Sequence, residues 1–231
     1  MDRVFDSRAL DAFYAEISSC AGISISELQD RLVSYSSLPM LPDDRRERTL
    51  SRRPWKKLRD EIAVLSDFFH FREIRDGRVR FPLNDHPPDA VYWPVDASTS
   101  INIEVTIAQG RARYEMAKEL VSRGSGRGFV DLQDDAPQSE FDDEFSQSRR
   151  MHSTEQALNT VGEAIKICLL KKNKPEFKEF VLIVRAGLSA LPHERWSAIF
   201  DDLRDVAATT PFGEVWIVGD DDQRRKGFQI K

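Results

Sequence analysis

Two carboxylates between residues 87 and 108, in the stretch PPDAVYWPVDASTSINIEVTIA, have the types and spacing to bind a divalent cation. The stretch is typical of two short apolar strands joined by small residues, with Asp89 opening the first strand and Glu104 inside the second. Apolar residues take alternate positions in the second strand, so Glu104 and Thr106 share the other face. A hairpin of these strands would place Asp89 and Glu104 side by side at one end of a sheet. Such a pair suits Mg²⁺, which takes one or two carboxylates together with waters and a substrate phosphate.

The same residues resemble the signature of a known family. Pro88-Asp89, a separation of 15 positions (104 minus 89) and then Glu104-Val105-Thr106 resemble the Asp…Glu-x-Lys motif of the restriction-endonuclease-like, or PD-(D/E)XK, nuclease superfamily. The resemblance implies that Asp89 and Glu104 hold Mg²⁺ or Mn²⁺ in a catalytic site. The family lysine, which orients or activates the attacking water, is replaced by Thr106, which would hydrogen-bond the water without taking its proton. The alternative for both acids is a salt-bridged or solvated position on a half-exposed strand.

Three further residues are candidates for this site. Members of the superfamily often carry an acidic residue near the metal, on the helix before the sheet. Glu61 is therefore a candidate third metal ligand, with an exposed helical acid as the alternative. A lysine or glutamine from elsewhere would have to stand in for the motif lysine, and Gln156 and Lys166, on a long helix expected after residue 153, are the candidates.

Charge is distributed unevenly along a chain of net charge −5. Residues 45–59 hold eight bases and one acid, and a second basic group lies between residues 111 and 127. These groups predict contacts with nucleic-acid phosphates. The alternative is that the bases are merely exposed to solvent at the start of a helix. Residues 131–145 hold seven acids and no base, which predicts a mobile or disordered loop, or a mimic that covers a basic groove. The phosphate-binding candidates are Arg52, Arg53, Lys56, Arg111, Arg113 and Arg127.

Length and composition limit the class of protein. The 231 residues, 40% hydrophobic and 32% charged, suffice for one α/β domain with a small helical extension. No apolar run approaches the roughly 20 residues that span a bilayer, so no membrane partner is expected. The first residues lack a basic segment followed by an apolar region, which favours a cytoplasmic protein.

Hydrophobic periodicity gives an expected order of elements. Residues 1–36 predict a helical hairpin, which a proline-containing linker to residue 44 separates from the remainder, residues 45–231. From residue 54 onward the patterns predict a helix, three strands, a helix with an inserted helix and loop, a strand, a helix and a strand. This succession agrees with the α-β-β-β-α-β core of the superfamily, a mixed central sheet flanked by helices. The predicted fold is therefore α/β, a restriction-endonuclease-like domain at 45–231 behind an N-terminal helical extension.

These expectations lead to two functional hypotheses. The first is a divalent-metal-dependent nuclease that hydrolyses phosphodiesters in DNA, or alternatively in RNA, because phosphodiester hydrolysis needs a metal and cations that hold the backbone. The second is a catalytically inactive protein of the same fold that binds nucleic acid or a protein partner. The N-terminal helices are candidates for contact with a sister subunit in a homodimer.

Overall fold

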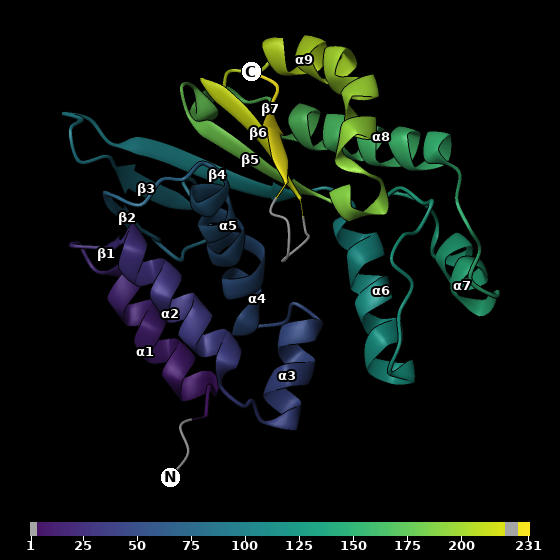
Figure 1. Cartoon of the computed structure of the whole chain (residues 1–231), viewed down its shortest axis with the longest axis horizontal. Helices are drawn as coiled ribbons and strands as arrows, with labels where there is room; N and C mark the ends of the chain where they lie inside the picture. Colours follow the sequence, from purple (N-terminus) through teal and green to yellow (C-terminus); the bar gives the residue numbers. More distant parts are fainter. Residues whose placement is uncertain (1–3, 220–225) are drawn as a thin grey trace. The chain divides into compact units, whose positions relative to one another are not determined.

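The strands of the protein form one mixed, open sheet. The computed structural model describes residues 4–219 and 226–231, and within them seven strands are joined in the order β1-β2-β3-β4-β5-β6-β7 (Figure 1). Two compact units are built on these elements: unit 1 comprises the described part of residues 1–106 with 179–183, and unit 2 comprises the described part of residues 107–178 with 184–231. The α/β class predicted from the sequence is therefore confirmed. The restriction-endonuclease-like core remains a prediction.

Unit 1 begins with the predicted helical hairpin. Its elements are α1 (Ser7–Ser18), the two-residue strand β1 (Ile23–Ser24), α2 (Ile25–Ser37) and α3 (Pro42–Thr49). The Asp6 side chain caps α1 by accepting from the Ala9 N–H at 2.9 Å. Gly22 makes the turn into β1 with φ 59, where a Cβ would stand 2.5 Å from the Val79 carbonyl oxygen, so glycine alone fits there. Both β1 and α3 are absent from the sequence-based expectation.

A long helical segment follows, as predicted. It consists of α4 (Trp55–Lys57), a π turn (Leu58–Ile62) and α5 (Ala63–Phe71). The apolar side chains at helical spacing are buried because this face packs into unit 1; they are Trp55, Leu58, Ile62, Leu65 and Phe69. Figure 1 shows α1, α2 and α5 on one side of the strands of unit 1.

Three antiparallel strands complete unit 1. They are β2 (Arg78–Arg80), β3 (Ala90–Trp93) and β4 (Ile101–Ile107), which leads into unit 2. The predicted hairpin of apolar strands is confirmed as β3 and β4, whose register pairs Ala90 with Ile103 and Val91 with Asn102. The predicted domain boundary at residue 44 does not separate the two units, since residues on both sides of it belong to unit 1.

Unit 2 contains the later helices and the last strands of the chain. Its helices are α6 (Gly110–Arg123), α7 (Gln138–Ser146), α8 (Thr154–Lys171) and α9 (Phe200–Ala208). Strand β5 (Val181–Ala186) is divided between the units, and β6 (Glu214–Gly219) pairs antiparallel with β7 (Gly227–Gln229). The apolar runs predicted as buried strands correspond to β5 and β6. None of the helices in the described ranges is long and apolar enough to cross a membrane.

The acidic segment is ordered, which corrects the prediction of a mobile loop. Residues 138–146 form α7, and Phe141, 1% exposed, packs in a cluster with Ala112 and Val130. Partly buried side chains close around this cluster, among them Phe145. Four of the seven acids lie on this helix because the apolar residues between them have a core to join. The alternative, a mimic that covers a basic groove, stays a prediction.

Candidate functional site

The β3–β4 hairpin brings the two predicted carboxylates together in unit 1. The pairing of Ala90 with Ile103, continued by one position, sets Asp89 opposite Glu104. Opposite residues of an antiparallel pair share a face of the sheet, with Cβ atoms about 5 Å apart. The Val105 N–H donates to Asp89 Oδ2 at 2.8 Å, so the Asp89 carboxylate is turned toward β4. The register therefore agrees with the predicted side-by-side placement of the two acids.

Glu104 lies in the interior of the protein. It is 4% exposed, and its neighbours Ile103 and Val105 are buried as well, so the middle of β4 is covered on both faces. Asp89 is half-buried at the end of β3. The alternative of a solvated acid on a half-exposed strand is therefore wrong for Glu104. A carboxylate is costly to bury, which marks this position as one that needs a functional or structural reason.

Glu61 interacts electrostatically with Asp89. It lies within the π turn of unit 1, where its side chain is 17% exposed and 3.1 Å from Lys57 Nζ. Burial, and after it the negative charge of Asp89, raise the pKa of Glu61 to about 7 against the opposing effect of Lys57. Glu61 is therefore not the exposed helical acid of the alternative interpretation. Its charge and that of Asp89 interact, and strongly perturbed acids of this kind are enriched at functional sites.

Carboxylate oxygens are the type of ligand that a hard divalent cation takes. Across residues 4–219 and 226–231, no set of three or more His, Cys, Asp or Glu side chains is arranged to hold a metal ion. Two carboxylates are nevertheless enough for Mg²⁺, which usually keeps several waters and takes a further oxygen from a substrate phosphate. Asp89 and Glu104 are the residues that would hold such an ion. Glu61 would interact with it through its charge, because a cation offsets the repulsion between Glu61 and Asp89.

Lys57 is a residue of this region that the sequence analysis did not select. Its ammonium group lies 3.1 Å from Glu61 Oε1, donates to the Asn84 carbonyl oxygen at 2.7 Å and lies 3.9 Å from Asp85 Oδ1. Lys57 thus links the helical segment to the loop that precedes Asp89. Its i,i+4 spacing to Glu61 was visible in the sequence, but the loop contacts arise from tertiary structure.

Thr106 is close to the carboxylate pair in sequence, whereas Gln156 and Lys166 lie in unit 2 and make other contacts. Thr106 is on β4, two positions beyond Glu104 and so on the same face, at the end of unit 1. Gln156 forms a capping box with Ser153 at the start of α8 in unit 2 and donates to Asp131 at 3.2 Å. These contacts explain Gln156 as a helix cap.

Lys166 is also engaged within unit 2. Its ammonium group lies 2.8 Å from Glu163 and 3.6 Å from Asp202, and the hydrogen bond to Glu163 raises the pKa of Lys166. A lysine that substitutes for the motif lysine should instead be placed beside the metal-binding carboxylates. Within unit 1, Lys57 lies beside Glu61, whose pKa responds to the charge of Asp89.

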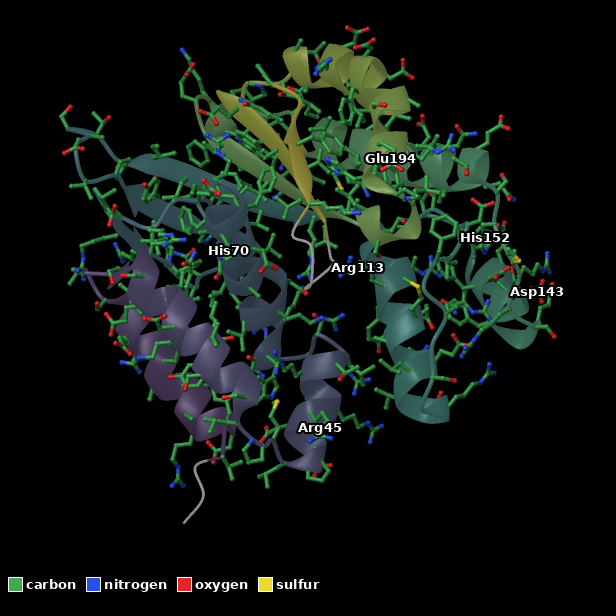
Figure 2. All side chains as sticks on the ribbon, in the orientation of Figure 1. Arg45, His70, Arg113, Asp143, His152 and Glu194 are labelled. Carbon is green, nitrogen blue, oxygen red and sulfur yellow. The ribbon has the colours of Figure 1, made fainter. Side chains whose placement is uncertain are left out.

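The phosphate-binding candidates of unit 1 are exposed at its surface. Arg53 is 85% exposed and 3.5 Å from Asp85, and Arg52 pairs with Glu47 at 3.4 Å. Lys56 is exposed on α4, next in sequence to Lys57. Figure 2 labels Arg45 on α3 of the same unit. We call the exposed bases of this region the basic surface; its members are Arg45, Arg46, Arg52, Arg53 and Lys56.

The basic residues of unit 2 are placed differently. The Arg127 side chain is 5% exposed and pairs with Glu119 and Glu144, so the predicted phosphate contact of Arg127 is corrected to a buried structural role. Arg111 donates to the carbonyl oxygens of Asp134 and Ala136 and lies over the Phe141 ring. The Arg111 guanidinium group thus stabilises the segment before α7 through hydrogen bonds to its backbone.

Arg113 is the remaining phosphate-binding candidate of unit 2. It is partly exposed on α6, where Figure 2 labels it. The phosphate contact of Arg113 therefore stays a prediction.

Comparison of the chain with protein-family models, with curated proteins and with solved structures gave no match. Membership of the PD-(D/E)XK superfamily therefore stays a prediction, and the arrangement of unit 1 is what supports a function.

Proposed function

We propose that the chain is a divalent-metal-dependent nuclease with a restriction-endonuclease-like core, and that unit 1 contains the metal site. The proposal is carried by one observation: the β3–β4 register sets Asp89 opposite Glu104, on the same face of the hairpin. Glu61, whose pKa responds to the charge of Asp89, adds a third carboxylate to the region. The order of helix, three strands, helices and strand from α4 to β5 supports the same proposal.

Each residue of the proposed site has a distinct chemical role. Asp89 and Glu104 bind Mg²⁺ or Mn²⁺, which when bound polarises a phosphate and lowers the pKa of a water molecule. Lys57 supplies the positive charge that Thr106 lacks, and an ammonium group beside a phosphate stabilises the negative charge that develops during hydrolysis. Thr106, on the face of β4 that carries Glu104, offers a hydroxyl for hydrogen bonding to water.

Nucleic acid is the proposed substrate, with DNA ahead of RNA. The basic surface gives unit 1 five exposed cations close in sequence to Lys57. Cations that neutralise phosphates release condensed counterions, so binding through this surface weakens as salt rises.

We expect Arg53→Ala and Lys56→Ala each to weaken binding of a duplex oligonucleotide and to reduce the slope of log K against log salt by about one. The measurement is fluorescence anisotropy between low and moderate salt. Arg204→Ala is the matched control, because this exposed arginine of α9 lies outside the basic surface and pairs with Asp201. Equal slopes for all four proteins would remove the basic surface from the proposal.

Binding without catalysis is the competing function, and the contacts of Lys57 favour it. The Lys57 ammonium group already contacts three oxygen atoms of unit 1, those of Glu61, Asn84 and Asp85, which would hold the lysine in a structural role. With Thr106 at the motif position, such a protein would bind nucleic acid or a partner without cleaving.

Cleavage assays decide between the two functions. We expect the wild-type protein to cleave plasmid or oligonucleotide substrates in Mg²⁺ or Mn²⁺ and to lose this activity in a chelator. Thr106→Lys restores an amine on the face of β4 that carries Glu104, so cleavage should persist or increase. Absence of cleavage by the wild-type protein and by Thr106→Lys, across duplex and single-stranded DNA and RNA, would favour the binding function.

A further inference from the structure

The hydroxyl group of Tyr14 is inserted into the backbone of the helical segment that carries Lys57 and Glu61. Tyr14, on α1, donates to the Pro54 carbonyl oxygen at 2.8 Å and accepts from the Leu58 N–H at 2.9 Å. Pro54 and Leu58 are four residues apart, so in a regular α-helix these two backbone groups would bond directly to each other. The Tyr14 hydroxyl lies between these two groups in place of that bond, and the Leu58 N–H also bonds to the carbonyl oxygen of Trp55, three residues back.

The insertion coincides with a local change of helix type. The segment continues as a π turn from Leu58 to Ile62, in which the Ala63 N–H reaches back five residues to the Leu58 carbonyl oxygen. A side chain inserted into the hydrogen-bond ladder is a recognised cause of helix irregularity, and single π turns occur frequently at functional sites. The hydroxyl therefore separates the Pro54 carbonyl oxygen from the Leu58 N–H at the point where the helix departs from α geometry.

The residues on this part of the helix are those that face the Asp89 side of unit 1. Lys57 directly precedes the π turn, Glu61 lies inside it, and their side chains are 3.1 Å apart. Lys57 also donates to the carbonyl oxygen of Asn84, in the loop that leads to Asp89. A change in the helix at Leu58 would move both side chains relative to this loop, because the direction of each depends on the backbone register.

Tyr14 is well suited to a fixed role in this position. Burial raises the pKa of Tyr14 far above its ordinary value, and the nearby charge of Glu61 acts in the same direction. The hydroxyl therefore keeps its proton, and with it the ability to donate to Pro54, at all ordinary pH values.

We propose that Tyr14 is a positioning residue, whose hydroxyl holds the helix open between Pro54 and Leu58 so that Lys57 and Glu61 are presented together at the loop before Asp89. The effect of this positioning on cleavage rests on the proposed nuclease function, whereas its effect on the helix can be measured without it.

The first test is the structure of Tyr14→Phe, which keeps the buried ring and removes only the hydroxyl. We expect the Leu58 N–H to bond directly to the Pro54 carbonyl oxygen, the π turn to disappear and the Lys57 contacts with Glu61 and Asn84 to be lost. Crystallography measures these contacts, and amide hydrogen exchange at Leu58 and Ala63 reports them in solution. Tyr114→Phe on α6 is the matched control and should leave this helix unchanged. A π turn and Lys57 contacts that persist in Tyr14→Phe would overturn the proposal.

The second test asks whether Tyr14 acts through Lys57. We expect Tyr14→Phe to lower kcat for metal-dependent cleavage about ten-fold while KM changes less than two-fold, since no substrate contact is removed. Lys57→Met should lower kcat by at least as much, and adding Tyr14→Phe to Lys57→Met should have no further effect. Additive losses in the double variant would refute action through Lys57. Loss of the π turn in Tyr14→Phe without cleavage by the wild-type protein would uphold the positioning of Lys57 and refute the nuclease proposal instead.

Discussion

Glu104→Ala is expected to abolish binding of Mn²⁺ and Mg²⁺, and with it any metal-dependent cleavage. The reason is the small number of ligands: with Asp89 and Glu104 as the two protein carboxylates, loss of one leaves a single acid to hold the ion. Isothermal titration calorimetry measures the affinity, and cleavage of plasmid DNA in Mn²⁺ measures the activity. Asp201→Ala is a suitable control because this acid of α9 is 96% exposed and lies outside the proposed site.

Two conservative variants separate metal binding from stability. Glu104 is buried, so alanine leaves a cavity, whereas Glu104→Gln keeps the volume and removes the charge. Asp89→Asn removes the charge and retains an oxygen that can accept from the Val105 N–H. Both variants should unfold near the wild-type temperature and still fail to bind the ion. Tight Mn²⁺ binding by Glu104→Ala would place the cation elsewhere.

Asp89→Asn has a second expected result, which tests how close Asp89 lies to Glu61. The charge of Asp89 is the second contribution, after burial, that raises the pKa of Glu61 to about 7. Its removal should move the pKa of Glu61 part of the way toward the ordinary value of 4.5. Carbon-detected NMR titration measures this change in metal-free protein, and an unchanged pKa would show that the two carboxylates are not coupled.

The carboxylate pair was predictable because its signal is local. Alternating apolar residues over 101–107 and a short linker from the preceding strand define a hairpin, and the hairpin register then follows from sequence separation. The burial of Glu104 was not predictable in the same way, since alternation predicts one solvated face. It depends on side chains that cover the second face of β4 and come from other elements.

The features that the sequence did not reveal depend on distant partners. Strand β1 has only two residues, and its pairing of Ile23 with Val79 exists because the chain returns to it more than fifty residues later. Helix α7 was hidden by the acids around Phe141, whose core partners Ala112 and Val130 lie outside the acidic segment. Arg127 looked like a surface base for the same reason: its acidic partners come from α6 and α7. Composition within a short window cannot reveal such partners.

The ion-pair cluster around Arg127 gives the second large effect that we expect, a loss of stability in Glu119→Ala. The Glu119 side chain is 3% exposed and accepts from both the backbone N–H and the guanidinium group of Arg127, at 2.8 and 3.3 Å. Without it, Arg127 would keep a buried charge and a buried N–H with fewer partners, and breaking a buried pair in this way costs about 3–5 kcal/mol. For a chain of this size we expect Tm to fall by on the order of 10 °C in calorimetry at neutral pH. Asp201→Ala, which breaks an exposed pair with Arg204, should cost less than about 1 kcal/mol.

The pH dependence of this loss identifies its cause. Burial raises the pKa of Glu119, but the backbone N–H and guanidinium group of Arg127 together lower it by more, so it lies below the ordinary value of 4.5. A carboxyl group whose pKa is lower in the folded state stabilises the protein above its unfolded pKa, and this stabilisation is lost as pH falls through the folded pKa. The difference in stability between wild type and Glu119→Gln should therefore be full at pH 7 and shrink below about pH 4. A difference that stays constant from neutral to acid pH would assign the loss to packing, because a cavity or a lost van der Waals contact does not titrate.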